Sequence, residues 1–316
     1  MRTVDDIRNA QLDLPHVVLT IGSFDGVHRG HQRILSDVVR AAREAGGTAV
    51  AMTMCPHPRE FFSPQHAPNL LTNDAKKLEL LEEAGIDVVC LLRFDSDVAN
   101  LDPVEFVEEV VHRRCGTKEL IVGHDFRFGK GAAGDYHFLT DVAPRFGLSV
   151  RQVEPLLIKG ERVSSTVIRE RVLQGDLDEA ELFLGRKYSI VGEIVTGRGI
   201  GTSLGYPTAN VRPCHSAVPA HGVYAAEVLL NGAAHLSAVN IGIAPTIRNE
   251  DIAIEAFLID FSGDIIGRHV EIVFHRRLRP EKRYPTREAL VEQIGQDVTA
   301  IREYFGEIFR KDGPPR

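Results

Sequence analysis

The first half of the chain alternates between short apolar runs and longer stretches with helical periodicity. An apolar run without polar alternation predicts a strand that is buried on both faces, as in a parallel sheet covered by helices. Such strands are expected at 17–21, 48–54, 88–92, 120–122 and 148–153. Helices are expected at 34–42, 74–84, 102–114, 165–174 and 177–184. Strands that alternate with helices predict an α/β domain with a Rossmann-like, doubly wound parallel sheet of five strands.

The pattern changes after residue 185, where short strands joined by tight turns take over. Strands are expected at 188–195, 222–230, 235–241, 253–260 and 269–278. Asn231-Gly232 is a strong signal for a hairpin turn. Closely spaced strands of this kind predict a small antiparallel β-barrel, followed by an amphipathic helix over 286–305. We therefore expect two domains, residues 1–185 and residues 186–316.

Length and composition agree with two globular domains and narrow the class of partner. At about 150 residues per domain, 316 residues give two domains. The net charge of −7 argues against a nucleic-acid partner, which favours a basic surface. The chain shows no signal peptide and no apolar run of about 20 residues, so a cytoplasmic protein without a membrane segment is expected. Four cysteines without a CxxC pair predict reduced thiols rather than a zinc site.

The segment 22–31, Gly-Ser-Phe-Asp-Gly-Val-His-Arg-Gly-His, joins the first strand to the first helix. A glycine-rich turn at a helix N-terminus presents backbone N–H groups to a phosphate. His28 and His31 are three residues apart, so they can share one face and stabilise charge in a transition state. The turn has no Walker-type lysine. A plain glycine-rich turn with two surface histidines is the alternative.

Two further segments follow predicted strands, at the edge where doubly wound sheets bind ligands. His57 lies in Cys-Pro-His-Pro after the second strand, where proline ends the ladder; a rigid turn is the alternative. The segment 123–131 imitates a P-loop but fails as one. Five residues instead of four separate Gly123 from Gly129, and a glycine follows the lysine. Its two phenylalanines fit plain packing equally well.

Polar groups also gather at the start of the predicted helix 165–174. Ser164 or Ser165 can cap this helix, and Arg169 lies one turn further on. Hydroxyls, backbone N–H groups and a guanidinium at a helix start suit a polyphosphate. An ordinary N-cap with a solvated arginine is the alternative.

In the second half, the chemistry lies in 197–210, Gly-Arg-Gly-Ile-Gly-Thr-Ser-Leu-Gly-Tyr-Pro-Thr-Ala-Asn. Its glycines can form a loop that folds over phosphates. Thr208 and Asn210 offer hard oxygen ligands suited to Mg²⁺. A flexible hairpin loop is the alternative. Glu255 lies in an alternating predicted strand, where a plain solvent-facing residue is equally simple.

Taken in order, these motifs resemble the prokaryotic bifunctional riboflavin kinase/FAD synthetase family, from about Val17 to Phe305. The segment 22–31 is similar to the HxGH signature of nucleotidyltransferases. Pro-His-Pro, Gly-His-Asp-Phe-Arg-Phe-Gly and Ser-Ser-Thr-Val-Ile-Arg resemble further FAD synthetase segments, and Gly-Tyr-Pro-Thr-Ala-Asn resembles the riboflavin kinase signature. Gly-Val-Tyr at 222–224 and Asn-Ile-Gly at 240–242 match as well. Thr202 and Ile266 stand where the family often has Arg and Tyr, which leaves flavin and nucleotide affinity open.

The resemblance implies a riboflavin kinase in residues 186–316 and an FMN adenylyltransferase in residues 1–185. The first would phosphorylate riboflavin with MgATP, and the second would adenylylate FMN to FAD. Glu255 would be the catalytic base of the kinase, and His28 and His31 the catalytic groups of the adenylyltransferase. ATP and phosphate would contact Gly22, Phe24, Asp25, Gly26, Gly30, Ser164, Ser165, Thr166, Arg169, Gly197, Gly201 and Gly205. Flavin would contact His57, Asp125 and Phe128, and Mg²⁺ would contact Thr208 and Asn210.

Two other functions stay open at this stage. One is a single-activity nucleotidyltransferase whose barrel merely binds flavin, and the other is a flavin carrier or regulator without turnover. Retention of Glu255, Thr208 and Asn210 argues against an inert barrel. Retention of His28, His31 and Arg169 argues against an inert first half. The expected partners are the small molecules riboflavin, FMN and ATP, and the sequence does not determine the oligomeric state.

Overall fold

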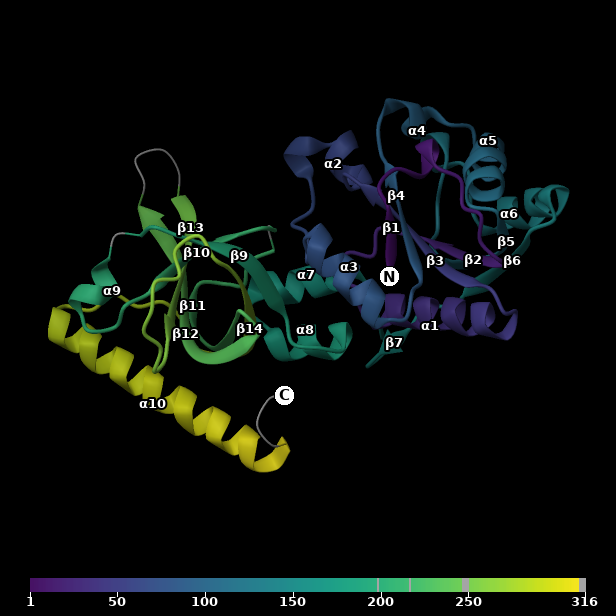
Figure 1. Ribbon diagram of the computed structural model, residues 1–316. Helices are drawn as coiled ribbons and strands as arrows, with labels where there is room; N and C mark the ends of the chain where they lie inside the picture. The colour runs from purple at the N-terminus through teal and green to yellow at the C-terminus, as the bar shows by residue number, and fades with distance from the viewer. Residues whose placement is uncertain (198, 216, 246–249, 313–316) are drawn as a thin grey trace. The chain divides into compact units, whose positions relative to one another are not determined.

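Figure 1 shows the computed structural model, which describes residues 1–197, 199–215, 217–245 and 250–312. Contacts divide the chain into two compact units. The first comprises Met1–Pro68 and Asp74–Ser165, and the second comprises Asn69–Asn73 and Thr166–Arg316. Each unit has its own sheet and its own core, and the two are described separately below.

The first unit is built on a parallel sheet of six strands in the order β1-β4-β3-β2-β5-β6. The strands are β1 (Arg2–Val4), β2 (Val17–Ile21), β3 (Thr48–Cys55), β4 (Val88–Arg93), β5 (Thr117–Gly123) and β6 (Ser149–Val153). All five predicted strands are confirmed, and the predicted count of five is wrong by one. The additional strand, β1, has three residues and lies at the sheet edge, with Val4 its single buried residue. Three residues with a single buried side chain form no apolar run, so the sequence did not predict this strand.

Helices cover both faces of this sheet, which explains why its strands are continuous apolar runs. Successive residues of a strand point to opposite faces. Leu19 therefore packs into one hydrophobic cluster with η3 (Phe106–Arg114), and Val18 packs into the other with α1 (Arg29–Glu44) and α3 (Asp74–Glu83). The helices are α1 (Arg29–Glu44), α2 (Pro58–Phe62), α3 (Asp74–Glu83), α4 (Ser96–Asn100), α5 (Pro103–Glu105), the π-helical η3 (Phe106–Arg114) and α6 (Tyr136–Val142). Shorter elements are η1 (Ile7–Asn9), η2 (Pro64–His66), η4 (Lys130–Ala132), η5 (Ala143–Phe146) and the hairpin β7 (Leu157–Ile158) with β8 (Glu161–Arg162).

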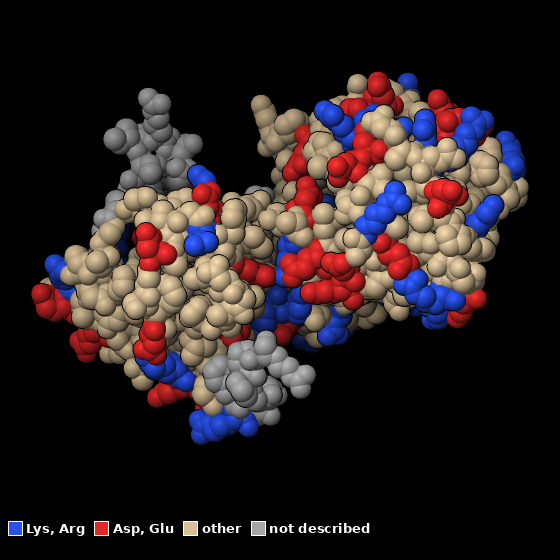
Figure 2. Space-filling model, in the orientation of Figure 1, with Lys and Arg blue, Asp and Glu red and all other residues tan. Residues whose placement is uncertain are grey.

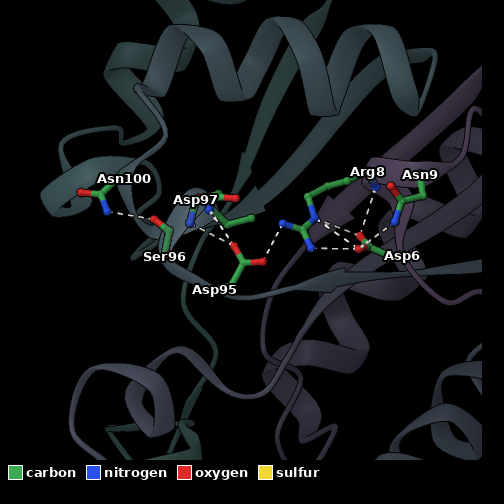
Figure 3. A network of polar contacts seen from close by, with 8 residues as sticks. Asp6, Arg8, Asn9, Asp95, Ser96, Asp97 and Asn100 are labelled. Atoms are coloured by element: carbon green, nitrogen blue, oxygen red, sulfur yellow. Dashed lines mark hydrogen bonds and ion pairs between the residues drawn. The ribbon is translucent and has the colours of Figure 1, made fainter.

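A polar network fastens the N-terminal segment to the chain that follows β4 (Figure 3). The Arg8 guanidinium donates to the carboxylate of Asp6 at 2.9 Å and to that of Asp95 at 2.8 Å. Asp95 also accepts from the backbone N–H of Val98, at the start of α4. That backbone hydrogen bond, together with Arg8, holds the pKa of Asp95 below its ordinary value. The network thus fixes η1 beside the end of β4.

The second unit contains a closed antiparallel barrel in the order β10-β13-β12-β11-β14-β9. Its strands are β9 (Ser189–Val195), β10 (Ala209–Pro213), β11 (Gly222–Leu230), β12 (Ala233–Pro245), β13 (Glu250–Leu258) and β14 (His269–Arg279). Its helices are α7 (Ser165–Gln174), α8 (Leu177–Leu184), α9 (Ile200–Ser203) and α10 (Arg287–Asp312). The predicted barrel and C-terminal helix are confirmed. The sequence did not predict β10, because Val211 is its one buried residue.

Side chains inside the barrel and beneath α10 form two separate layers. Ile254 and Ala256 of β13 are fully buried. Phe257, of opposite parity, packs instead in the cluster that Ile301 and Phe305 of α10 form. Since residues of like parity share a face, Glu255 lies on the same face of the sheet as Phe257. The candidate base therefore belongs to the outer face of the barrel.

Helices α8 and, from Thr166 on, α7 belong to the second unit, whereas the sequence placed them in the first domain. Within the second unit, α8 contacts β14. Gly175, which ends α7, lies near the Tyr224 hydroxyl, so a Cβ there would be 3.2 Å from that oxygen. An amphipathic pattern shows that a helix covers a core but does not show which one. The boundary between the two activities at residue 185 stays a prediction.

Two properties of the molecule bear on its partners. Among the described residues, no helix has the length and apolar character needed to cross a membrane. On the face of the first unit seen in Figure 2, basic and acidic side chains are interspersed, so this face carries no continuous basic surface. A polynucleotide backbone requires such a surface.

Candidate active sites

The turn between β2 and α1 holds the two candidate histidines side by side. His28 is the N-cap of α1, and its Nδ1 accepts a hydrogen bond from the backbone N–H of His31 at 3.2 Å. The proton of a neutral His28 ring must therefore be on Nε2. The two rings stack with centroids 3.6 Å apart and planes 14° apart. His28 thus presents an N–H donor from a fixed orientation.

His31 is held in its neutral form by its surroundings. Burial, with a further contribution from the neighbouring His28, places the pKa of His31 well below its ordinary value. The ring of Phe24 packs edge-on against His31, with centroids 5.3 Å apart. The Nδ1 atom of His31 is buried and has no hydrogen-bond partner among the described residues. At neutral pH the pair can therefore supply hydrogen bonds without a protonated ring at His31.

The backbone of this turn is strained, and a serine from later in the chain supports it. Phe24 and Val27 have positive φ angles of 48° and 37°. Such conformations cost of order 1–3 kcal/mol each and cluster at ligand sites. Ser165 Oγ donates to the backbone carbonyl of Asp25 at 2.9 Å. The fold thus brings the start of α7 to the glycine-rich turn, as the phosphate-binding prediction for Ser165 requires.

Thr166 and Arg169, predicted to bind phosphate beside Ser165, belong to the second unit. Within that unit, Arg169 Nε donates to the carbonyl of Asn69 at 2.5 Å. Asn69 starts the segment that the first half of the chain contributes to the second unit. The phosphate-binding roles of Thr166 and Arg169 stay predictions.

His57 lies near the same turn of the first unit. It caps α2 by accepting from the backbone N–H of Arg59 at 3.1 Å, and the Glu60 carboxylate accepts from the His57 backbone N–H at 3.1 Å. Burial lowers the pKa of His57, against the opposing influence of the Asp25 and Glu60 carboxylates. Asp25, whose charge acts on the pKa of His57, belongs to the segment 22–31. A neutral ring in this position suits a contact with flavin.

The two candidate flavin residues in the segment that follows β5 differ in exposure to solvent. The Asp125 carboxylate is 62% exposed and accepts from Arg162 of β8 at 3.2 Å. Phe128 is buried, with its ring 5.4 Å from those of Phe106 and Phe126. Packing accounts for Phe128, which is the alternative that the sequence left open. Its contact with flavin stays a prediction.

An aromatic cluster beside His57 was missed by the sequence analysis. Phe61 and Phe62 of α2 meet Phe94, which follows β4, with all three ring pairs edge-to-face at 5.4–5.6 Å. Phe62 is 63% exposed. An exposed aromatic surface at the carboxyl edge of β3 and β4 suits a flat heteroaromatic ring. Two adjacent phenylalanines directly after Pro-His-Pro were the available signal.

In the second unit, the glycine-rich loop lies directly on the two candidate metal ligands. A Cβ at Gly197 would be 1.8 Å from Asn210 Nδ2, and a Cβ at Gly201 would be 2.9 Å from Thr208 Oγ1. Gly205 has a φ of 84°, a conformation that favours glycine. The loop therefore needs glycine for its close approach to Thr208 and Asn210. That it folds over phosphates stays a prediction.

The register of the barrel places Glu255 between two asparagines. Glu255 of β13 pairs with Asn210 of β10 on one side and with Asn240 of β12 on the other. Directly opposed residues of antiparallel strands share a face, with Cβ atoms about 4.5–5.5 Å apart. The structure thus brings Glu255 beside Asn210, and it adds Asn240, which the sequence matched to the family without assigning it to the site. The Glu255 carboxylate has no hydrogen bond or ion pair with another described residue.

The N-terminal part of α10 holds the loop in place. Arg287 donates to the carbonyl of Ser203 in α9. Tyr206 packs edge-on against Phe257, with centroids 5.2 Å apart.

Of the two departures from the family pattern, Thr202 lies in α9 and Ile266 is 61% exposed. The described residues contain no cluster of three or more His, Cys, Asp or Glu side chains that could hold a metal.

Comparison with known proteins gives the same division of chemistry along the chain. Residues 10–167 match the family model of FAD synthetase, and residues 184–305 match that of riboflavin kinase. A bifunctional riboflavin kinase/FMN adenylyltransferase of Escherichia coli strain K12 is 36% identical over 97% of this chain and 98% of its own. The protein of the same name from Pseudomonas fluorescens is 38% identical over 96% of this chain and 97% of its own.

A solved structure shows the same fold. The crystal structure of a Streptococcus pneumoniae protein named as a macrolide-efflux protein has a TM-score of 0.86 and 28% sequence identity, and covers 95% of this chain and 98% of its own. Both family models match in order, and the named relatives align over almost their whole length. This chain therefore belongs to the family of bifunctional riboflavin kinase/FMN adenylyltransferases.

Proposed function

We infer that this chain makes FAD from riboflavin in two steps, each of which consumes ATP. The barrel transfers the γ-phosphoryl group of ATP to the ribityl 5′-hydroxyl of riboflavin and releases ADP. The first unit then joins FMN to the adenylyl group of a second ATP and releases pyrophosphate. The observation that supports this most is the pairing of candidate catalytic residues within each unit. His28 stacks on His31 in the first unit, and Glu255 pairs with Asn210 in the second, in the order in which the two family models match the chain.

In the kinase, Glu255 takes the proton from the attacking hydroxyl. Its carboxylate is half-buried on the outer face of the barrel and is not engaged by another described side chain. Phosphoryl transfer needs positioning and charge neutralisation more than covalent chemistry. The loop 197–205 supplies positioning, because its glycines allow the backbone to approach the phosphates closely.

The residues around the loop fit Mg²⁺. Thr208 and Asn210 offer neutral oxygen atoms against Gly201 and Gly197 of the loop. Mg²⁺ bound with a nucleotide takes few protein ligands and the rest from phosphates and water. Thr208 and Asn210 would hold the ion, which would neutralise phosphate charge when bound. No larger acidic site is required.

In the adenylyltransferase, His28 and His31 stabilise the charge that develops on the α-phosphate as the FMN phosphate attacks it. The donor of the neutral His28 ring is its Nε2–H, because Nδ1 accepts from the backbone N–H of His31. Backbone N–H groups at the start of α1 add to this stabilisation. Since the FMN phosphate is itself the nucleophile, no covalent enzyme intermediate is needed.

Contacts on the same side of the first unit are proposed to hold the flavin. His57, Asp125 and the aromatic cluster around Phe62 lie after β3, β4 and β5, at the carboxyl edge of the sheet. The need for ATP in both steps supports a location in the cytoplasm.

Two parallel incubations, one with riboflavin and one with FMN in its place, separate this function from its two alternatives. The protein is mixed with riboflavin, ATP and MgCl₂, and the flavins are separated by chromatography over time. FMN should appear first and FAD second, and both should stop when EDTA removes Mg²⁺. FAD from supplied FMN without FMN from riboflavin would indicate a single-activity nucleotidyltransferase. Bound but unchanged riboflavin would indicate a carrier.

A further inference from the structure

Asn240-Ile241-Gly242 of β12 has no role in the two reactions as described so far. Ile241 is fully buried inside the barrel. Because side chains alternate along a strand, Asn240 and Gly242 belong to the outer face. That is the face to which Glu255 belongs. The motif therefore lies beside the candidate base. In the sequence it is not adjacent to any other site residue.

Glu255 has a carboxamide on each side, and the two carboxamides differ in their surroundings. Asn210 lies under the glycine-rich loop, as the contact with Gly197 shows. Asn240 pairs with Glu255 from the opposite strand, on the side away from β10. Its side chain has no hydrogen bond among the described residues. The carboxamide of Asn210 lies against Gly197, in the loop proposed to hold the phosphates, which leaves that of Asn240 for Glu255.

We propose that Asn240 is a positioning residue for the kinase, whose carboxamide N–H donates to the Glu255 carboxylate and aims it at the ribityl hydroxyl. Asn240 touches neither the reacting hydroxyl nor the phosphate in this arrangement, and it acts through Glu255. The proposal rests on the proposed role of Glu255 as the base. A donor to an ionised carboxylate both orients it and stabilises its charged form.

Other charged groups near this pair come from two more elements. Glu281 follows β14 and lies over Gly242, where a Cβ would be 2.5 Å from its Oε1 atom. Arg279 of β14 lies in the same cross-strand row, beyond Val223, and is paired with Asp297 of α10 at 2.7 Å. Glu281 is thus a second carboxylate on this face, and the neutral Asn240 adds no further negative charge beside Glu255.

The first test is steady-state kinetics of Asn240→Ala and Asn240→Asp in the full-length protein. Asn240→Ala should lower kcat for riboflavin phosphorylation roughly 10- to 100-fold, the usual worth of a hydrogen bond to a charged group. KM for riboflavin and ATP should change little, and the acid limb of the kinase pH profile should move to higher pH. Asn240→Asp should lose more, because it puts a carboxylate next to Glu255. Asn240→Gln, which keeps the donor, should recover part of the rate.

Two controls accompany these variants. Adenylylation of supplied FMN by the same protein should stay at the parent rate. This shows that the variant is folded and that its concentration is correct. Asn231→Asp makes the same chemical change in the turn between β11 and β12, where Asp-Gly is also a favoured turn pair, and it should leave both activities unchanged. Loss of both activities in Asn240→Ala would contradict the proposal. So would a raised KM for riboflavin or ATP with an unchanged pH profile.

A double variant decides whether Asn240 acts through Glu255. If it does, Glu255→Gln with Asn240→Ala should be no slower than Glu255→Gln alone. If the double variant were slower than Glu255→Gln by the full factor that Asn240→Ala costs alone, the proposal would be overturned, and Glu255 would still be the base. A Glu255→Gln enzyme that phosphorylates riboflavin at the parent rate would instead refute the proposed function of Glu255, so the two failures are distinguishable.

Discussion

Gly201→Ala should disable the kinase while leaving the adenylyltransferase intact. The backbone N–H of Tyr206 donates to the Gly201 carbonyl at 2.9 Å, which closes the loop. A Cβ at Gly201 would lie 2.3 Å from the Tyr206 carbonyl oxygen, and ordinary contact begins near 3.4 Å. The clash is with backbone, so the loop or Tyr206 must move by about 1 Å. The candidate ligand Thr208 lies against the same position.

A misplacement of about 1 Å in a positioning element can cost roughly 100-fold in rate. We therefore expect kcat/KM for riboflavin phosphorylation to fall by about that factor. Each purified variant is given riboflavin or FMN with ATP and MgCl₂, and product flavins are measured by chromatography. Adenylylation of FMN should proceed at the parent rate, because the His28 and His31 site belongs to the other unit.

Gly306→Ala is the matched control for this change. Gly306 lies in α10, with open space around its Cβ position and an ordinary φ. Alanine there should leave both activities unchanged and should stabilise the helix by up to about 1 kcal/mol. If Gly201→Ala, folded as judged by its thermal transition, phosphorylated riboflavin at the parent rate, the loop would not position the phosphates as argued.

The remaining predictions concern the histidines of the first unit. His28→Ala should slow adenylylation of FMN roughly 100- to 1,000-fold, the usual cost of a lost transition-state donor, with riboflavin phosphorylation unchanged; equal losses in both activities of a folded variant would place His28 outside a single site. His31, whose pKa burial lowers in the folded state, binds its proton more readily when unfolded, so it lowers stability as pH falls below about 6.5. His31→Gln should therefore lose less free energy of unfolding than the parent between pH 7.5 and pH 5.5 in urea titrations; an equal loss would contradict the buried, neutral assignment.

Local patterns predicted most of the fold because they report burial and turn chemistry directly. Continuous apolar runs identified the five longer strands of the parallel sheet, and the hairpin signal at Asn231-Gly232 lies between β11 and β12. The glycines of the motif at 197–210 predicted a close-approaching loop, and the structure shows close backbone approach at Gly197 and Gly201. These features depend on residues close together in the sequence.

Features that depend on long-range pairing escaped the sequence. Residues 69–73 join the second unit through contacts such as the hydrogen bond from the Ala217 N–H to the Leu70 carbonyl, which no local pattern encodes. The position of Asn240 opposite Glu255 follows from strand register, and a shift of one residue would have put it on the other face. The aromatic cluster likewise requires β3 and β4 to be neighbours.

The most direct test of the two-site account gives one variant, Glu255→Gln, two substrates. The change keeps the size of the side chain and removes the proton acceptor, so the barrel should fold normally. With riboflavin, ATP and MgCl₂, FMN formation should fall roughly 100- to 10,000-fold, the range of a positioned general base. With FMN in place of riboflavin, FAD should form at the parent rate. Riboflavin phosphorylation at the parent rate, or loss of FAD formation from FMN in the folded variant, would contradict the account.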